Sequence, residues 1–263
     1  MVEKNAHTKA CCVCGMDACS RLKPVPDQLI GVFHCTGGSY STVQHVSTSP
    51  PPMSTGGKLR LLCLHGHRQS GNLFRAKLGG FRRAVRQLAD LEFITAPHRV
   101  DGLEGEEEGY TWWRSTSEEV DKQMEQESIR VISKAWKQGE YDGLLCFSQG
   151  AALGGLLSVL QHTNKLDFRF DFCILVSGFV SDRHREEFGN LGGEQVEVAS
   201  LHIMGEKDAI IEAARSEELA ARFREAKVCL HPGGHYLPYT GDTKETVTTF
   251  LKDRLQAKSK LEQ

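Results

Sequence analysis

The sequence predicts an α/β fold, in which about six mainly parallel strands form one sheet with helices on both faces. Short apolar runs alternate about six times with segments whose apolar residues repeat at helical spacing. The runs lack polar alternation, which is typical of strands buried on both faces. The 263 residues are 40% hydrophobic and 25% charged, an ordinary globular composition.

Residues 1–57 are predicted to form a disordered extension or linker, and residues 58–263 the folded domain. The first segment contains Pro50-Pro51-Pro52, Gly37-Gly38 and many Ser and Thr, without a sustained period. Regular apolar patterning begins near Lys58.

The first half of the domain begins with the run LRLLCLHG, residues 59–66, which predicts a buried strand. Helical spacing over 73–90 predicts a helix, and LEFITAP, residues 91–97, predicts a strand that Pro97 ends. Residues 98–118 are expected to be irregular, with an acidic flank at 104–108, and helical spacing returns over 119–138.

The second half repeats the alternation. Strands are expected at 142–147, 172–177, 199–204 and 227–231, with helices near 149–162, 215–226 and 243–257. Because parallel strands end at the same edge of a sheet, the loops that begin at Gly66, Ser148, Gly205 and Pro232 should converge there.

Charge and hydropathy exclude several classes of protein. The formal net charge is −2, so no basic surface predicts a nucleic-acid partner. The uncharged segment at 143–160 is interrupted at Ser148-Gln149-Gly150, and predicts a buried strand and helix instead of a membrane span. The first twelve residues lack the apolar stretch of a signal peptide. The sequence does not indicate any protein partner.

The nine cysteines favour a reducing compartment. Cys63, Cys146, Cys173 and Cys229 lie in apolar runs and should be buried free thiols, and the total is odd. A cytoplasmic location, with the nucleus as an additional one, is therefore expected.

A cysteine-rich segment near the start allows a zinc site to be considered. Cys11, Cys14, Cys19, His34 and Cys35 match the spacing of no standard zinc module, so no metal is expected. Palmitoylation at Cys11-Cys12 has equally little support.

Ser148 is the candidate nucleophile, because it lies between an apolar strand and a helix that begins with small residues. A serine on such a tight turn can be held with its hydroxyl exposed, whereas most serines before helices are only N-caps. The turn needs small residues two before and two after the serine, which here are Cys146 and Gly150.

A serine hydroxyl needs a base, and the base needs an acid that orients it. His235, in the Gly-rich loop after the last strand, is the candidate base. Asp208 follows the strand at 199–204 and is the candidate acid, with Asp182 and Glu206 as competitors. His98 and His202 should be structural, and His65 should fix a loop.

Five segments together carry a resemblance to a known family. LCLHGHRQSG, GLLCFSQGAALGGLL, FCILVSGF, LHIMGEKDAII and HPGGHYLP occur in this order over residues 58–256, and resemble the FSH-type serine hydrolases of the α/β-hydrolase superfamily. The resemblance implies an α/β-hydrolase fold, a triad of Ser148, Asp208 and His235, and hydrolysis of carboxylic esters with apolar acyl chains. This sequence has Cys146 where the family has Gly, and His67 where the family more often has an apolar residue.

Backbone N–H groups should stabilise the oxyanion, and apolar side chains should hold the acyl chain. The N–H groups of Gln149 and His67 are the candidate donors, with Arg68 next to consider. Trp112 and Trp113 are candidate pocket residues because a long irregular segment such as 98–118 usually has a function. Four more lie just beyond a predicted site loop: Phe179, Ile210, Ile211 and Leu237.

The sequence therefore predicts a serine carboxylesterase that acts on a small-molecule ester with a medium to long apolar acyl chain and needs no cofactor. Two alternatives remain open. One is an acyl-protein thioesterase or lysophospholipase, which shares the acyl-enzyme step. The other is a lipid-binding module that keeps the fold without catalysis, for which Cys146 is the only support in the sequence.

Overall fold

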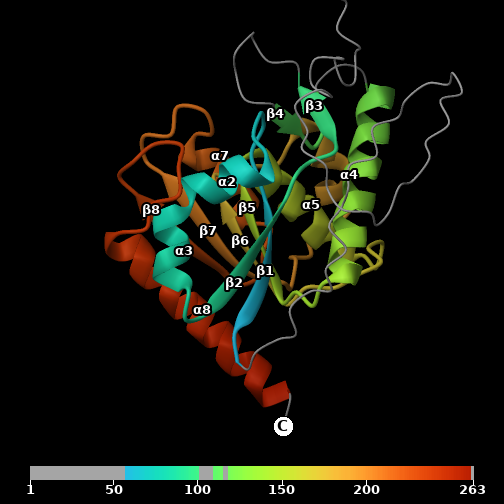
Figure 1. Cartoon of the computed structure of the whole chain (residues 1–263). Helices are drawn as coiled ribbons and strands as arrows, with labels where there is room; N and C mark the ends of the chain where they lie inside the picture. The colour runs from blue at the N-terminus through green and yellow to red at the C-terminus, as the bar shows by residue number, and fades with distance from the viewer. Residues whose placement is uncertain (1–56, 101–108, 115–117, 262–263) are drawn as a thin grey trace, which may run out of the picture. The chain divides into compact units, whose positions relative to one another are not determined.

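A computed structural model describes residues 57–100, 109–114 and 118–261 (Figure 1). Contacts divide the chain into the units Met1–Thr48 and Ser49–Gln263, and the described residues all belong to the second. The predicted extension up to residue 56, its cysteine-rich segment and the acidic residues 104–108 lie outside the described residues.

Six parallel strands form the central sheet, as the sequence predicts. The order across the described sheet is β2-β1-β5-β6-β7-β8, and every neighbouring pair is parallel. The strands are β1 (Leu59–Leu64), β2 (Ala89–Ile94), β5 (Gly143–Phe147), β6 (Phe172–Val176), β7 (Ala199–Gly205) and β8 (Ala226–His231). This arrangement brings the loops after β1, β5, β7 and β8 to one edge.

Helices cover both faces of the sheet (Figure 1), because alternate strand residues point to opposite sides. Leu144 and Cys146 pack in one apolar cluster, with residues of α4 (Glu118–Gln138), α5 (Gln149–His162) and α7 (Ala213–Ala220). Leu145 and Phe147 pack in a second cluster, with residues of α2 (Gly71–Lys77), α3 (Gly79–Val85) and α8 (Gly241–Leu261).

The prediction of one helix over 73–90 is wrong. Two short helices, α2 and α3, meet at Leu78, where Gly79 and Gly80 follow with low helix propensity. The second helix ends at Val85, since the chain enters β2 at Ala89.

Three other segments differ from expectation. Part of the region expected to be irregular pairs as an antiparallel ribbon, β3 (His98–Val100) with β4 (Gly109–Thr111). A 3-10 turn η1 (Asp182–His184) and helix α6 (Arg185–Gly189) were not expected. Helix α7 ends before the predicted residue 226, because Phe223 pairs with Val196 in an isolated bridge.

The segment at 143–160 forms β5 and most of α5, as expected for a buried strand that turns into a helix. In the described part of the chain, no helix has the length and apolarity needed to cross a membrane. Cys63, Cys146, Cys173 and Cys229 are buried free thiols, as predicted. Burial raises the pKa of the Cys63 and Cys146 thiols well above the usual range, so these thiols stay protonated and unreactive.

Candidate active site

Ser148 lies on a strained turn between β5 and α5. Its backbone has φ 53° and ψ −116°, a conformation that side-chain-bearing residues rarely adopt. The Ser148 N–H donates to the Val176 carbonyl at 2.9 Å, which fixes the turn against β6. Although Ser148 directly precedes α5, its side chain makes no capping hydrogen bond to the helix. The hydroxyl is therefore not used as a helix cap.

Glycines on α5 explain how the turn fits against the sheet. A Cβ at Gly150 would lie 2.5 Å from the Leu64 carbonyl oxygen and 2.6 Å from the His65 carbonyl oxygen. One turn further along, a Cβ at Gly154 would lie 2.8 Å from the Cys146 Sγ. Cys146 is therefore accommodated because Gly154 leaves room for its sulfur, and the strained turn forms with Cys in this position.

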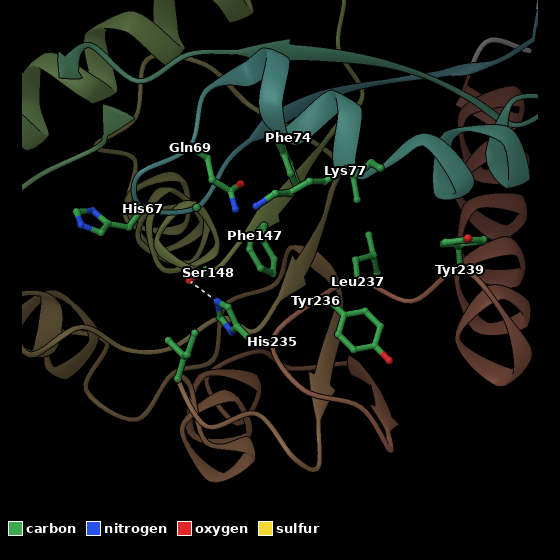
Figure 2. Close-up of a pocket in the computed structure, with 13 residues that line it drawn as sticks. His67, Gln69, Phe74, Lys77, Phe147, Ser148, His235, Tyr236, Leu237 and Tyr239 are labelled. Atoms are coloured by element: carbon green, nitrogen blue, oxygen red, sulfur yellow. Dashed lines mark hydrogen bonds between the residues drawn. The ribbon is translucent and has the colours of Figure 1, made fainter. Parts of the chain in front are cut away.

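The candidate triad residues lie in one hydrogen-bonded chain (Figure 2). The His235 Nε2 lies 3.0 Å from the Ser148 Oγ, and the His235 Nδ1 lies 2.8 Å from the Asp208 Oδ2. Residues 27 and 87 positions apart meet in this way because β5, β7 and β8 end at the same edge of the sheet. The His235 ring also packs against Phe147, with 4.8 Å between ring centroids.

Asp208 is buried and accepts four hydrogen bonds. The N–H groups of Ile210 and Ile211 donate to Oδ1, each at 2.9 Å, and the Ser177 hydroxyl donates to Oδ2 at 2.9 Å beside His235. Burial acts to raise the pKa of the Asp208 carboxyl, but these hydrogen bonds, led by that from Ile211, outweigh it and lower the pKa below the usual value.

The ionised Asp208 determines the tautomer of His235. A carboxylate only accepts hydrogen bonds, so the proton of the neutral imidazole must be on Nδ1. The Nε2 lone pair then faces the Ser148 hydroxyl, which donates to it. In this arrangement the imidazole can remove the proton of the serine.

The competing acids lie elsewhere. Asp182 is exposed on η1, where it accepts a hydrogen bond from Arg185 at 2.8 Å, and Glu206 is exposed. Within the described residues, no group of three His, Cys, Asp or Glu side chains could hold a metal ion.

The other histidines have structural contacts. The His65 Nε2 accepts from the Ala96 N–H at 3.0 Å, and burial lowers its pKa to about 4. His98 bonds to the Met124 carbonyl oxygen at 2.8 Å, and His202 is buried next to Ser200. These contacts agree with the roles expected from the sequence.

The loop after β1 runs directly beside the serine. A Cβ on Gly66 would lie 3.3 Å from the Ser148 Cβ. The next residues turn sharply, with Arg68 at φ 57°, and Gln69 then accepts a hydrogen bond from the Tyr110 N–H at 2.8 Å. His67, the residue after Gly66, lines the same cavity as Ser148 and so remains a candidate oxyanion donor.

Side chains of this loop and of α5 are joined through Thr111. The Thr111 Oγ1 lies 2.9 Å from the His67 Nδ1 and 2.8 Å from the Gln149 Oε1. Gln149 also bonds to the backbone of Trp112 and Trp113, at 3.1 and 2.9 Å. This network holds the two candidate oxyanion residues in fixed relation. Burial, and then the nearby Arg68 charge, lower the pKa of His67.

A cavity of about 700 Å³ opens beside Ser148 and His235. Its walls come from α2 and from the loop after β8, and Phe147 and Ser148 lie between them (Figure 2). Most of the wall is apolar, formed by Phe74, Leu78, Phe147, Ile210, Leu237 and the rings of Tyr236 and Tyr239.

Of the predicted pocket residues, Ile210 and Leu237 line this cavity, whereas Trp112, Trp113, Phe179 and Ile211 do not. Trp112 is fully buried because its indole N–H donates to the His65 carbonyl oxygen at 2.8 Å. Trp113 packs on His184, Phe179 lies under the Arg215 guanidinium, and the Ile211 side chain is buried while its N–H serves Asp208.

Several site residues were missed in the sequence. Phe74 lies in the segment 73–90, whose apolar spacing predicts only a helix, and Gln69 and Lys77 carry no sequence signal. Ser177, which donates to Asp208, ends the strand of the segment FCILVSGF, and its position after a buried strand could have identified it.

Comparison with known proteins identifies the family. Residues 53–247 match the family described as serine hydrolase (FSH1). The chain belongs to this family. The matched range of the FSH1 serine hydrolase family includes Ser148, Asp208 and His235, and so the sequence-based resemblance is confirmed.

Relatives named esterases cover most of the chain. Esterase CG5412 of Drosophila melanogaster is 41% identical over 214 residues, which are 76% of this chain and 75% of that protein. Esterase OVCA2 of Danio rerio is 36% identical over 222 residues, 74% of this chain and 96% of that protein.

Solved structures confirm the α/β-hydrolase fold. The crystal structure of esterase PE8 has a TM-score of 0.55 at 22% identity, covering 75% of this chain and 93% of that chain. The structure of Zea mays acyl-protein thioesterase 2 has a TM-score of 0.54 at 17% identity, covering 78% and 96%.

Proposed function

We propose that this FSH1-family member is a serine carboxylesterase that hydrolyses esters with medium to long apolar acyl chains. The observation that carries the proposal is the hydrogen-bonded chain from the Ser148 Oγ through His235 to Asp208, with distances of 3.0 and 2.8 Å. The esterase names of relatives that are 41% and 36% identical support the same reaction class.

The reaction begins when His235 Nε2 takes the proton of Ser148 and the serine oxygen attacks the ester carbonyl carbon. Asp208 stabilises the imidazolium that forms and holds its Nδ1–H. The backbone N–H groups of Gln149 and His67 donate to the oxyanion of the tetrahedral intermediate. The intermediate collapses to an acyl-enzyme as His235 protonates the leaving alcohol.

Water completes the cycle. His235 removes a proton from a water molecule, which attacks the acyl-enzyme, and the serine leaves with the proton returned to it. These steps use only side-chain and backbone groups of this chain, so the proposal includes no cofactor.

The cavity supports the choice of an apolar acyl chain. Phe74, Leu78 and Leu237 present apolar surface beside the nucleophile, and a volume of about 700 Å³ exceeds the needs of a short acyl group. A set of p-nitrophenyl esters from acetate to palmitate tests this point: kcat/KM should rise from the shortest chain to a maximum in the medium to long range. A maximum at acetate contradicts the assignment of chain length.

The Ser148→Ala variant tests the function itself. It should fold with an unchanged melting temperature and lose ester turnover, because no other described residue is placed to attack. Turnover at the wild-type rate contradicts the assignment. Acyl-thioesters and lysophospholipids, tested as substrates in the same assay, decide between a carboxylesterase and the thioesterase or lysophospholipase alternative. If the wild type turns over none of these substrates, the result favours a lipid-binding module.

The proposal places the enzyme in the cytoplasm, with the nucleus as an additional location. Its support is the four cysteines that remain free thiols among the described residues. Fractionation of cells that express the tagged chain tests it, and recovery in the secretory pathway contradicts it.

A further inference from the structure

One wall of the cavity is polar, although no step of the proposed reaction requires it to be. Gln69 and Lys77 line the cavity beside apolar residues, and neither takes part in the hydrogen-bonded chain of Ser148, His235 and Asp208. None of the 13 lining residues is Asp or Glu, so Lys77 supplies positive charge that the wall does not neutralise.

Gln69 is held rigidly in this wall. Its carbonyl accepts the Tyr110 N–H and its own N–H donates to the Gly66 carbonyl at 3.3 Å, so the backbone on both sides is fixed. Gln69 is only 9% exposed, and its Oε1 has no hydrogen-bond partner among the described residues. Because Oε1 is enclosed by protein, the NH₂ is the end of the carboxamide that can reach a ligand in the cavity, and it can only donate hydrogen bonds.

The side chain of Lys77 lines the same part of the cavity as Gln69. It lies in the last turn of α2, and Figure 2 shows its side chain extending toward Gln69, with the two polar ends facing one another above Phe147. In the described part of the chain, the side chain of Lys77 makes no hydrogen bond and no ion pair. Its three N–H donors are therefore available to a ligand.

We propose that Gln69 and Lys77 form an anion-binding subsite, and that the preferred esters carry a carboxylate near the scissile bond. The nitrogen end of the Gln69 carboxamide faces the Lys77 nitrogen (Figure 2), so two groups of hydrogen-bond donors meet in the cavity. The Lys77 ammonium and the Gln69 NH₂ then both donate to the substrate carboxylate. The apolar wall holds the hydrocarbon part of the substrate. This inference rests on the proposed esterase function.

The carboxylate can belong to the acyl group or to the alcohol, and paired esters separate the two sources. The acyl pair is mono-p-nitrophenyl adipate and p-nitrophenyl hexanoate, and the alcohol pair is 4-hexanoyloxybenzoate and phenyl hexanoate. For each pair, the measured quantity is the ratio of kcat/KM for the charged ester to that for the neutral ester. Intrinsic reactivity cancels when this ratio is compared between variants.

Lys77→Met removes the positive charge and should lower the ratio at least tenfold for one pair. Lys77→Glu replaces it with a negative charge and should lower the ratio further. Gln69→Glu should also lower it, since it adds a negative charge at nearly constant shape. Arg75→Met is the matched control: Arg75 is exposed on the same helix but does not line the cavity, so its ratio should not change. Ratios that stay within twofold of wild type in both Lys77 variants, for both pairs, overturn the subsite.

A binding measurement separates this inference from the proposed function. Adipate titrated calorimetrically into Ser148→Ala protein should bind at least tenfold more weakly when Lys77→Met is added. Equal binding with and without Lys77→Met overturns the subsite even if the wild type is an active esterase. Binding that depends on Lys77, in a protein that turns over no ester, retains the subsite and overturns the proposed function.

Discussion

The Asp208→Asn substitution tests whether the Asp208 carboxylate determines which nitrogen of His235 carries the proton. The Asp208 Oδ1 accepts from the Ile210 and Ile211 N–H groups, each at 2.9 Å. An asparagine must keep its carbonyl oxygen at this position, because its NH₂ would face two donors. The NH₂ therefore points at the His235 Nδ1, where it can only donate.

This orientation forces the wrong tautomer. With Nδ1 as the acceptor, the imidazole proton moves to Nε2, and His235 can no longer accept the proton of Ser148 across the 3.0 Å between Nε2 and Oγ. A triad held in this state loses roughly 10⁴-fold in kcat. That loss corresponds to about 5.5 kcal/mol of transition-state stabilisation, at about 1.36 kcal/mol for each tenfold change.

The assay is steady-state hydrolysis of p-nitrophenyl hexanoate at neutral pH, together with ¹⁵N NMR of His235, which reports the protonated nitrogen. The matched control is Asp182→Asn. Asp182 was the competing candidate for the acid, but its carboxylate is exposed on η1, so this variant should leave kcat unchanged. A kcat for Asp208→Asn within tenfold of wild type, with the proton still on Nδ1, would refute the reasoning.

Further substitutions test the turn, the loop network and the buried histidines. Gly150→Ala puts a Cβ 2.5 Å from the Leu64 carbonyl oxygen and should cost about 1–3 kcal/mol of stability in thermal melts, whereas Gly79→Ala, with no atom within 4 Å, should cost none. Equal melting temperatures contradict this. Thr111→Val removes the hydroxyl between His67 and Gln149, the two candidate oxyanion residues, and should lower kcat by about tenfold, with KM little changed. An unchanged kcat contradicts the positioning role. Burial lowers the pKa of His202 to about 3. In the unfolded state His202 binds a proton below about pH 6.5, whereas in the folded state it stays neutral down to much lower pH. The free energy of unfolding should therefore fall as the pH drops below about 6.5, by up to about 1.4 kcal/mol per pH unit. His202→Gln should flatten that slope in denaturant titrations, and parallel slopes contradict the assignment.

The fold was largely predictable because its strands are unambiguous in the sequence. Runs such as 142–147 and 172–177 have no charged interior residue, so only a sheet buried on both faces suits them. Boundaries inside weaker patterns were not predictable. The break at Leu78 depends on Gly79-Gly80, and the early end of α7 depends on a bridge between Phe223 and distant Val196.

The hydrogen-bonded chain at the site was predictable because topology alone brings its three loops together. The walls of the cavity beside Ser148 were not predictable, since they depend on the direction in which each side chain points. Trp112 follows an acidic segment, which suggested a pocket residue. Instead, its indole N–H donates to the His65 carbonyl oxygen, and the ring is buried in the core. Lys77 lies on a helix face with no feature in the sequence that distinguishes it from Arg75.

The most direct test of the central claim is the site at which a fluorophosphonate probe reacts. Only an activated serine attacks such a probe rapidly, so peptide mass spectrometry should find one phosphonate adduct, on Ser148, formed within minutes at micromolar probe. The adduct should be absent from Ser148→Ala and formed at least a hundredfold more slowly in His235→Ala. An unmodified Ser148 in folded wild-type protein, or an adduct at another residue that accounts for the loss of ester turnover, would contradict the account.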